Sequence, residues 1–168
     1  VDEESYLQVI RYKTARLFEA SAQLGAILAK ANSEQQKQAA AFGRHIGTAF
    51  QLMDDLLDYT ADAAQMGKNA GDDLREGKPT LPLIHLLENG NTEERLLVRA
   101  AIEQNQDLPD DVFAQILSAV QNSGALDYTH AAAKREVHLA IECIQDFPKN
   151  DATEALHALC QYSLSRRA

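Results

Sequence analysis

Residues 50–59 read FQLMDDLLDY, which places three aspartates in a stretch whose other side chains are mostly apolar. The apolar side chains predict a packed segment, and a charged group is costly to bury unless something compensates it. On a helix, which turns about 100° per residue, Asp54 and Asp58 lie one turn apart, with Phe50 and Gln51 one turn earlier on the same stripe. The stretch therefore predicts a helix with an apolar back and a front that carries carboxylates.

Two explanations of the carboxylates stay open on the residues alone. Asp54, Asp55 and Asp58 can form a solvated face or pair with a Lys or Arg of a neighbouring helix, which is the commoner arrangement for acidic residues on a helix. The flanking sequence, however, has no basic residue three or four positions away. The alternative is a divalent cation, and carboxylate oxygens without a nearby His or Cys suit Mg²⁺.

The composition is that of a helical globular protein. With 168 residues, 45% of them apolar, the chain is long enough for one domain with a substantial core. Glycine and proline are sparse and Trp is absent, so we predict an all-α bundle of about seven helices. Helical periodicity, with Ser5 and Ser33 as predicted N-caps, covers these ranges: 6–31, 33–61, 81–90, 92–105, 109–124, 125–147 and 151–167.

Charge and cysteine content exclude several classes of function. The formal net charge of −9 argues against nonspecific nucleic-acid binding, which needs a basic face. Cys143 and Cys160 lie far apart and the five histidines lack zinc-ligand spacing, so we predict reduced thiols in the cytoplasm.

No stretch approaches the roughly 20 apolar residues of a membrane span, and no basic-then-apolar leader is present. The opening VDEESYLQVI lacks a Met, which suggests a piece of a longer protein.

The segment that follows the aspartates, residues 62–80 (DAAQMGKNAGDDLREGKPT), is the longest predicted irregular stretch. It carries Lys68 and Lys78 among three glycines, which let a backbone approach a ligand closely. It is no Walker A loop, because Lys78 is followed by proline. Taken alone, the segment is better explained as a solvated turn. Because it directly follows an aspartate-rich helix, it indicates a site for Mg²⁺ and a diphosphate.

Three stretches together resemble the trans-isoprenyl diphosphate synthases. FQLMDDLLD matches their second aspartate-rich motif, FQxxDDxxD; GKNAGDDLREGKPTLPL resembles their GKxxGxDLxEGKxTLPL segment; and YKTARLFEASAQLGA resembles the upstream helix with a Lys-Thr pair. The match runs in order from about Tyr6 to Pro82, and KTARLFEA, GTAFQL and EGKPTLPL are most similar to the bacterial octaprenyl members. The resemblance implies an isoprenyl synthase (class I terpenoid synthase) helical bundle, of which residues 1–168 are the C-terminal portion.

The resemblance also implies a role for each matching residue. Metal ligands are implied at Asp54, Asp55 and Asp58, with Asp54 and Asp58 holding a Mg²⁺ that bridges to the allylic diphosphate. Contacts with that leaving diphosphate are implied for three lysines: Lys13, Lys68 and Lys78. Positions beside the allylic substrate are implied for Thr14, Phe50 and Gln51. The implied catalytic residues are Lys13, Thr14, Gln51 and Asp54. Arg166 and Arg167 match basic tails of some relatives only loosely.

The implied reaction joins isopentenyl diphosphate to an allylic prenyl diphosphate, giving a long all-trans product, octaprenyl by similarity, for quinone side chains. Members are usually homodimers. The family's first aspartate-rich motif does not precede Lys13 here, so we expect this chain alone to be inactive. Two other possibilities remain: a noncatalytic subunit of a heteromeric synthase, and an acidic helical interaction module. A terpene cyclase has the same fold but usually a different second metal motif.

Overall fold

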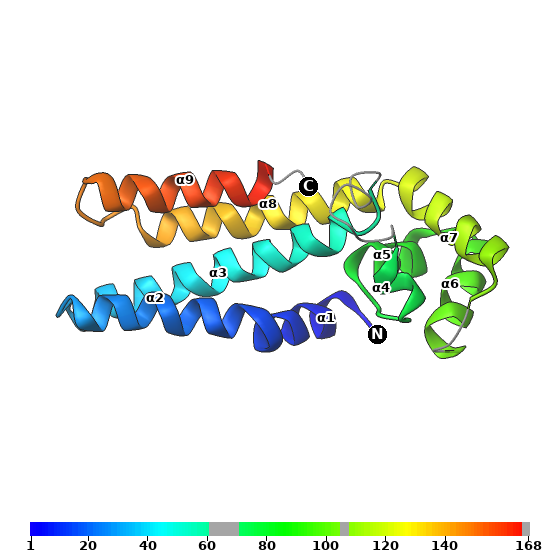
Figure 1. Ribbon diagram of the computed structural model, residues 1–168, viewed down its shortest axis with the longest axis horizontal. Helices are drawn as coiled ribbons and strands as arrows, with labels where there is room; N and C mark the ends of the chain where they lie inside the picture. Colours follow the sequence, from blue (N-terminus) through cyan, green and yellow to red (C-terminus); the bar gives the residue numbers. More distant parts are fainter. Residues whose placement is uncertain (61–70, 105–107, 166–168) are drawn as a thin grey trace. The chain divides into compact units, whose positions relative to one another are not determined.

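The computed structural model describes residues 1–60, 71–104 and 108–165, and they confirm the all-α prediction: within these ranges the regular elements are helices (Figure 1). The chain divides into two compact units. The first unit contains the described residues of Val1–Tyr6 and Asp54–His130, and the second unit those of Leu7–Met53 and Ala131–Arg166. Lys68, Arg166 and Arg167 lie outside the described residues.

In the second unit, long helices pack side by side. They are the π-helical turn η1 (Arg11–Ala15), α2 (Arg16–Leu28), most of α3 (Ser33–Leu57), the later part of α8 (Ala125–Cys143) and α9 (Asp151–Ser165) (Figure 1). Their core joins Phe42 and Ile46 of α3 to Val137 of α8 and Cys160 of α9. Cys143 and Cys160 are free thiols, as predicted. Packing of an apolar face supplies most of the stability of amphipathic helices in folded proteins, and α2 is the exception here, because none of its residues is buried.

Two glycines let α3 approach the preceding helix closely. A Cβ at Gly43 would lie 2.3 Å from the carbonyl oxygen of Phe18, and one at Gly47 would lie 2.7 Å from the Cα of Ala15. Both distances are too short for real atoms, so the contact between α3 and the η1–α2 segment requires glycine at these positions.

The first unit consists of shorter helices around a separate core. They are α4 (Asp72–Arg75), α5 (Leu81–Asn89), α6 (Thr92–Gln104) and α7 (Asp110–Asn122), together with parts of α1 (Glu3–Ile10), α3 and α8. The core gathers large buried side chains: Tyr59, Leu74, Leu83, Leu86, Val98, Phe113, Ile116 and Val120. Among the described residues, no helix combines the length and hydropathy needed to cross a bilayer.

The predicted helix caps were wrong by one and three residues. Asp2 accepts the backbone N–H of Ser5 through Oδ1 at 2.8 Å, so Asp2 caps α1. Asn32 accepts the N–H of Gln35 at 2.9 Å, and Gln35 Oε1 accepts the N–H of Asn32 in return at 3.2 Å. Asx side chains just before a helix are better placed than the following serines to satisfy its first N–H groups.

Three local features depart from the predicted helix pattern. The single helix predicted over 6–31 contains the π-helical turn η1, and the short helix α4 lies inside the segment predicted as irregular. The helix predicted to run to residue 61 ends as α3 at Leu57. The carbonyl of Asp58 then accepts the N–H of Gly71 at 2.7 Å, which binds the start of the α4 region to the end of α3.

Candidate active site

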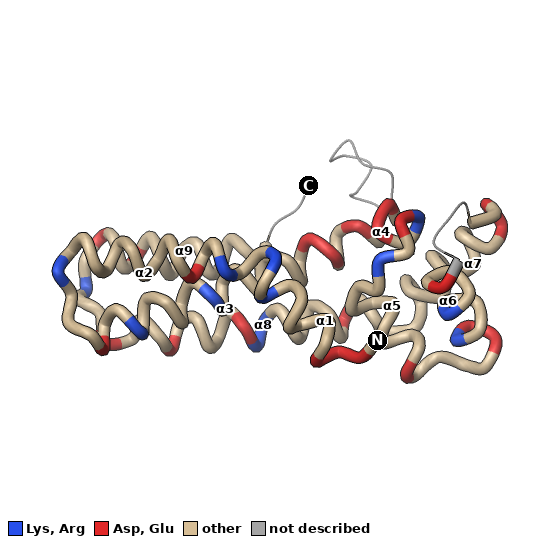
Figure 2. Tube along the Cα trace, turned by 90° about the horizontal axis from the view of Figure 1, so that it is seen from below, with Lys and Arg blue, Asp and Glu red and all other residues tan. Residues whose placement is uncertain are grey.

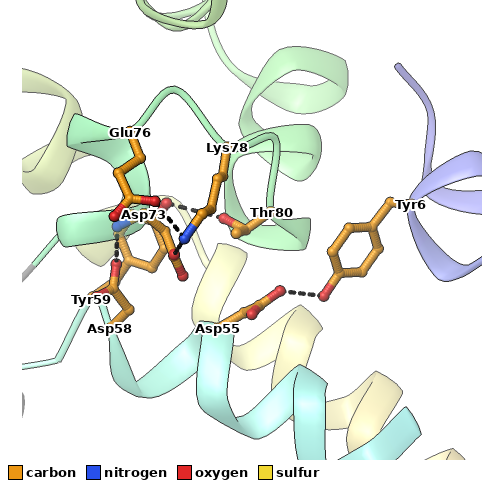
Figure 3. A network of polar contacts seen from close by, with 8 residues as sticks. All are labelled: Tyr6, Asp55, Asp58, Tyr59, Asp73, Glu76, Lys78 and Thr80. Atoms are coloured by element: carbon orange, nitrogen blue, oxygen red, sulfur yellow. Dashed lines mark hydrogen bonds and ion pairs between the residues drawn. The ribbon is translucent and has the colours of Figure 1, made fainter. Parts of the chain in front are cut away.

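The three aspartates at the end of α3 point to different partners. The side chains of Asp55 and Asp58 are buried, at 4% and 8% exposure, and Asp54 is half-buried. Asp55 Oδ2 accepts the hydroxyl of Tyr6 at 2.5 Å, whereas Asp58 Oδ2 accepts the backbone N–H of Asp73 at 3.0 Å (Figure 3). Neighbouring residues on a helix diverge by about 100°, which separates Asp54 from Asp55.

Burial gives Asp58 an unusual protonation behaviour. Loss of solvation raises the pKa of Asp58 to about 6, and the charges of Asp73 and Asp72 act in the same direction, against the backbone N–H groups of the same two residues. Figure 2 shows that acidic residues gather at the end of α3 and around α4, both in the first unit. A bound cation would relieve this concentration of negative charge.

Lys78 lies beside the aspartates of the first unit. Its Nζ is 2.8 Å from Asp73 Oδ1 and 2.6 Å from Glu76 Oε2, and these two hydrogen bonds raise the pKa of Lys78 (Figure 3). Asp73 thus accepts a bond from Lys78 through its side chain and donates one to Asp58 through its backbone. The structure therefore brings Lys78 and Asp58 together through Asp73. Lys68, the other lysine predicted from this segment, is outside the described residues.

The residues predicted to lie beside the allylic substrate cluster in the second unit. Thr14, on η1, donates its hydroxyl to Gln51 Oε1 at 2.8 Å. The rings of Phe50 and Phe18 lie 5.6 Å apart between centroids. Lys13, also on η1, is exposed. A π-helical turn widens the backbone locally and is often found at functional positions.

Sequence reasoning missed three residues of this neighbourhood. Asp73 stands between Lys78 and Asp58, Tyr6 binds Asp55, and the hydroxyl of Tyr59 lies 2.9 Å from that of Thr80 (Figure 3). A signal for Asp73 was present, since Asp72 and Asp73 follow Gly71 inside the predicted diphosphate-binding segment. Tyr6 and Tyr59 carried none, because a lone tyrosine on an apolar face is usually a core residue.

The residues at the end of α3 fit Mg²⁺ by their chemistry. Asp54 and Asp58 offer hard carboxylate oxygens, and burial raises the pKa of Asp58, so a cation bound there would favour its ionised form. Within the described ranges, no three acidic, His or Cys side chains converge as a ready metal cluster. Mg²⁺ commonly uses one or two carboxylates and completes its shell with water and substrate phosphates, so the donor set is sufficient.

Comparison with known proteins decides the family. The model of the polyprenyl synthetase family matches residues 1–120. The chain belongs to the polyprenyl synthetase family. It is 46% identical over 166 residues to the octaprenyl diphosphate synthase of Escherichia coli and 44% identical over 164 residues to an all-trans-nonaprenyl-diphosphate synthase of Rhodobacter capsulatus. These matches cover 99% and 98% of the chain but 51% and 49% of those relatives, so the chain spans about half their length.

Solved structures of polyprenyl synthetases share the fold. The polyprenyl synthase of Caulobacter crescentus, complexed with calcium and isoprenyl diphosphate, superposes with a TM-score of 0.92 at 37% identity, covering the whole of this chain and 51% of that one. The heptaprenyl diphosphate synthase of Staphylococcus aureus gives a TM-score of 0.92 at 27% identity, covering 100% of this chain and 52% of the other. The predicted isoprenyl synthase bundle is therefore confirmed.

Proposed function

We propose that this chain carries the residues that bind the leaving diphosphate of the allylic substrate in a polyprenyl diphosphate synthase. The complete enzyme would condense isopentenyl diphosphate with an allylic prenyl diphosphate into a long all-trans polyprenyl diphosphate, octaprenyl by similarity, for a quinone side chain in the cytoplasm. The observation that carries the proposal is the group formed by Asp58, Asp73 and Lys78, with Asp54 one helical turn before Asp58, in a chain 46% identical to an octaprenyl diphosphate synthase.

The reaction requires stabilisation of a departing diphosphate. The allylic C–O bond breaks to give a carbocation and a diphosphate; the double bond of isopentenyl diphosphate then attacks the cation, a C–C bond forms, and a proton passes to the diphosphate. Mg²⁺ held at Asp54 and Asp58 would neutralise charge on that leaving group. The ammonium group of Lys78 would bind a diphosphate oxygen after its bonds to Asp73 and Glu76 are broken. These two bonds raise the pKa of Lys78, so the side chain is protonated. Lys13 and Lys68 would contribute further positive charge.

We propose roles beside the allylic substrate for Thr14, Gln51 and Phe50, as the resemblance implies. The Thr14 hydroxyl donates to Gln51 Oε1. This hydrogen bond fixes both side chains and orients their neutral dipoles. Neutral dipoles can stabilise an allylic cation without reacting with it, whereas a strong base would capture a proton or the cation itself. Phe50, packed against Phe18, supplies an aromatic wall. We propose these roles for the full-length enzyme, which we expect to be a homodimer.

The 168-residue chain alone should bind the allylic diphosphate but should not catalyse its condensation. Calorimetry with MgCl₂ and farnesyl diphosphate should show Mg²⁺-dependent binding to the 168 residues, and Asp54→Asn should weaken it at least tenfold while leaving the helical circular dichroism unchanged. Turnover should be absent from the chain alone and should appear when the part of the Escherichia coli relative that this chain lacks is fused before it. Binding that is indifferent to Mg²⁺ and to Asp54→Asn would refute the proposed function and favour an acidic interaction module.

A second candidate is a subunit of a heteromeric synthase. One relative, component 2 of a heptaprenyl diphosphate synthase from Geobacillus stearothermophilus, is 35% identical over 158 residues and is named as one component of its enzyme. If this chain worked in that way, it would become active on mixing with a separate partner chain, without covalent fusion. Activity of the fused protein as a homo-oligomer would instead support the single-chain enzyme.

A further inference from the structure

We propose that Tyr6 and Asp55 form a buried positioning pair that holds the end of α3 in the geometry needed for the metal and diphosphate site. The proposal rests on the proposed function and goes beyond it, because it removes Asp55 from the metal ligands and gives a role to Tyr6. Both residues belong to the first unit.

The contact between the two side chains is short and shielded from solvent. Tyr6 Oη donates to Asp55 Oδ2 at 2.5 Å across 49 residues of sequence, and the exposures of Tyr6 and Asp55 are 6% and 4% (Figure 3). Burial and the charge of Asp55 raise the pKa of Tyr6 well above its usual range, so the phenol keeps its proton and remains the donor. A hydrogen bond to a buried charged acceptor is among the stronger ones in proteins.

The position of Asp55 makes this bond relevant to its neighbours. Asp55 lies directly after Asp54 and three residues before Asp58, so fixing its side chain restricts rotation and fraying of the last turn of α3. Asp58 is held from the other side by the backbone N–H of Asp73. Because Asp55 is no metal ligand in this proposal, the Tyr6–Asp55 bond acts on Asp54 and Asp58 only through the last turn of the helix. Its loss should therefore change metal affinity by less than the roughly 10- to 100-fold typical of bonds made directly to metal-binding side chains.

The first unit contains a second tyrosine–carboxylate pair, which is part-buried and lies away from the three aspartates. The hydroxyl of Tyr128 donates to Glu3 Oε2 at 2.6 Å, again a tyrosine bound to a carboxylate over a long sequence separation. Glu3 is at the start of α1, and neither residue lies on α3 or α4. Removing the Tyr128 hydroxyl therefore controls for the general effect of breaking a tyrosine–carboxylate bond in this unit.

The test is a Mg²⁺ titration of the 168-residue chain by calorimetry in the presence of inorganic pyrophosphate. Tyr6→Phe removes one oxygen atom and should weaken Mg²⁺ binding by roughly three- to tenfold, less than the loss of a bond made directly to a metal ligand, whereas Tyr128→Phe should leave it within about twofold. If Tyr6 acts through Asp55, the double variant Tyr6→Phe/Asp55→Ala should bind Mg²⁺ no more weakly than Asp55→Ala alone. Urea unfolding midpoints of all variants report whether each one is folded under the assay conditions.

A second measurement uses the wild-type sequence, so it cannot be confused by the unfolding of a variant. In chain labelled with 3-fluorotyrosine, the ¹⁹F signal of Tyr6 should shift on addition of Mg²⁺ and pyrophosphate while that of Tyr128 stays in place. The positioning role is overturned if the Tyr6 signal does not respond, or if a folded Tyr6→Phe chain keeps wild-type affinity. Wild-type chain that binds no Mg²⁺ even with pyrophosphate overturns the proposed function itself and this role with it. The two failures are therefore distinguishable.

Discussion

At the scale of single residues, the carboxyl group of Asp58 links proton binding to stability. Its pKa is about 6 in the folded chain and roughly 3.9 in an unfolded one. Between these values the folded state holds the proton more tightly, so the free energy of unfolding should fall as pH rises from about 4 to 6, by roughly 2 to 3 kcal/mol. Urea titrations at several pH values measure this fall.

Asp58→Asn supplies the comparison for that pH dependence. The amide does not titrate, so the variant should lack this pH dependence and gain stability relative to wild type as pH rises from about 4 to 6, with a constant difference above that range. Other carboxyl groups titrate equally in both proteins, and the difference between them isolates Asp58. A variant whose unfolding free energy falls with pH as steeply as that of wild type would contradict the assignment.

Lys78 provides a prediction about binding. Lys78→Ala should weaken binding of pyrophosphate with Mg²⁺ by about 10- to 100-fold, because one charge-assisted hydrogen bond contributes roughly 1.5 to 3 kcal/mol. The free energy of unfolding should change by less than about 1 kcal/mol, because the Lys78 side chain that contacts Asp73 and Glu76 is exposed to solvent. Lys149→Ala, at another exposed lysine, is the control. Equal affinities of the two variants in calorimetry would exclude Lys78 from the diphosphate site.

At the scale of elements, the π-helical turn η1 is held by a buried carboxylate. Glu136 of α8 accepts from Arg11 at 3.2 Å and lies 2.6 Å from Nδ1 of His45. Burial alone would raise the pKa of Glu136, but the hydrogen bond and charge of His45 and those of Arg11 outweigh it and lower the pKa. Glu136→Gln should therefore destabilise the chain by about 1 to 3 kcal/mol in urea unfolding.

The same helix contains a control for Glu136. Glu142 also faces a histidine, His138, at 3.2 Å, but both side chains are more than half exposed. Glu142→Gln should change the free energy of unfolding by less than about 0.5 kcal/mol. If Glu136→Gln and Glu142→Gln lower the free energy of unfolding equally, the contacts of Glu136 with Arg11 and His45 do not hold η1 in place.

Helix packing gives an opposed pair of glycine predictions. Alanine is favoured over glycine inside a helix by about 1 kcal/mol, so Gly25→Ala on α2, where a Cβ meets nothing within 4 Å, should raise stability by 0.5 to 1 kcal/mol. Gly43→Ala on α3 should instead lower stability by more than 1 kcal/mol, because its Cβ would collide with backbone of Phe18 at 2.3 Å. Thermal melts of the two variants should shift in opposite directions.

At the scale of the whole molecule, α2 exposes a large apolar face. Leu17, Leu24, Ile27 and Leu28 are 73%, 55%, 47% and 74% exposed, although their spacing places them along one side of the helix. A face of this kind favours association. Isolated chain should therefore self-associate as its concentration rises, and the triple change of Leu17, Leu24 and Leu28 to Lys should reduce association in sedimentation runs without loss of helicity. Equal sedimentation of both proteins would contradict this expectation.

Much of the architecture followed from the sequence because it depends on local patterns. Apolar residues at helical spacing predicted the long helices, and the motif around Asp54 predicted the family that the comparisons confirm. Helix caps were misplaced, since Asp2 and Asn32 compete with the serines that follow and only the backbone geometry selects between them. The roles of the matching residues remain predictions.

What the sequence by itself determined is the set of chemical groups and their order along the chain: carboxylates on one helix, a Lys-Thr pair before it and a lysine-bearing segment after it. Only the tertiary structure decided how those carboxylates are used, with Asp55 facing Tyr6 and Asp58 facing Asp73. The reason is physical. Helical periodicity fixes the direction in which a side chain leaves its own helix, but its partner depends on segments that fold back from far along the chain.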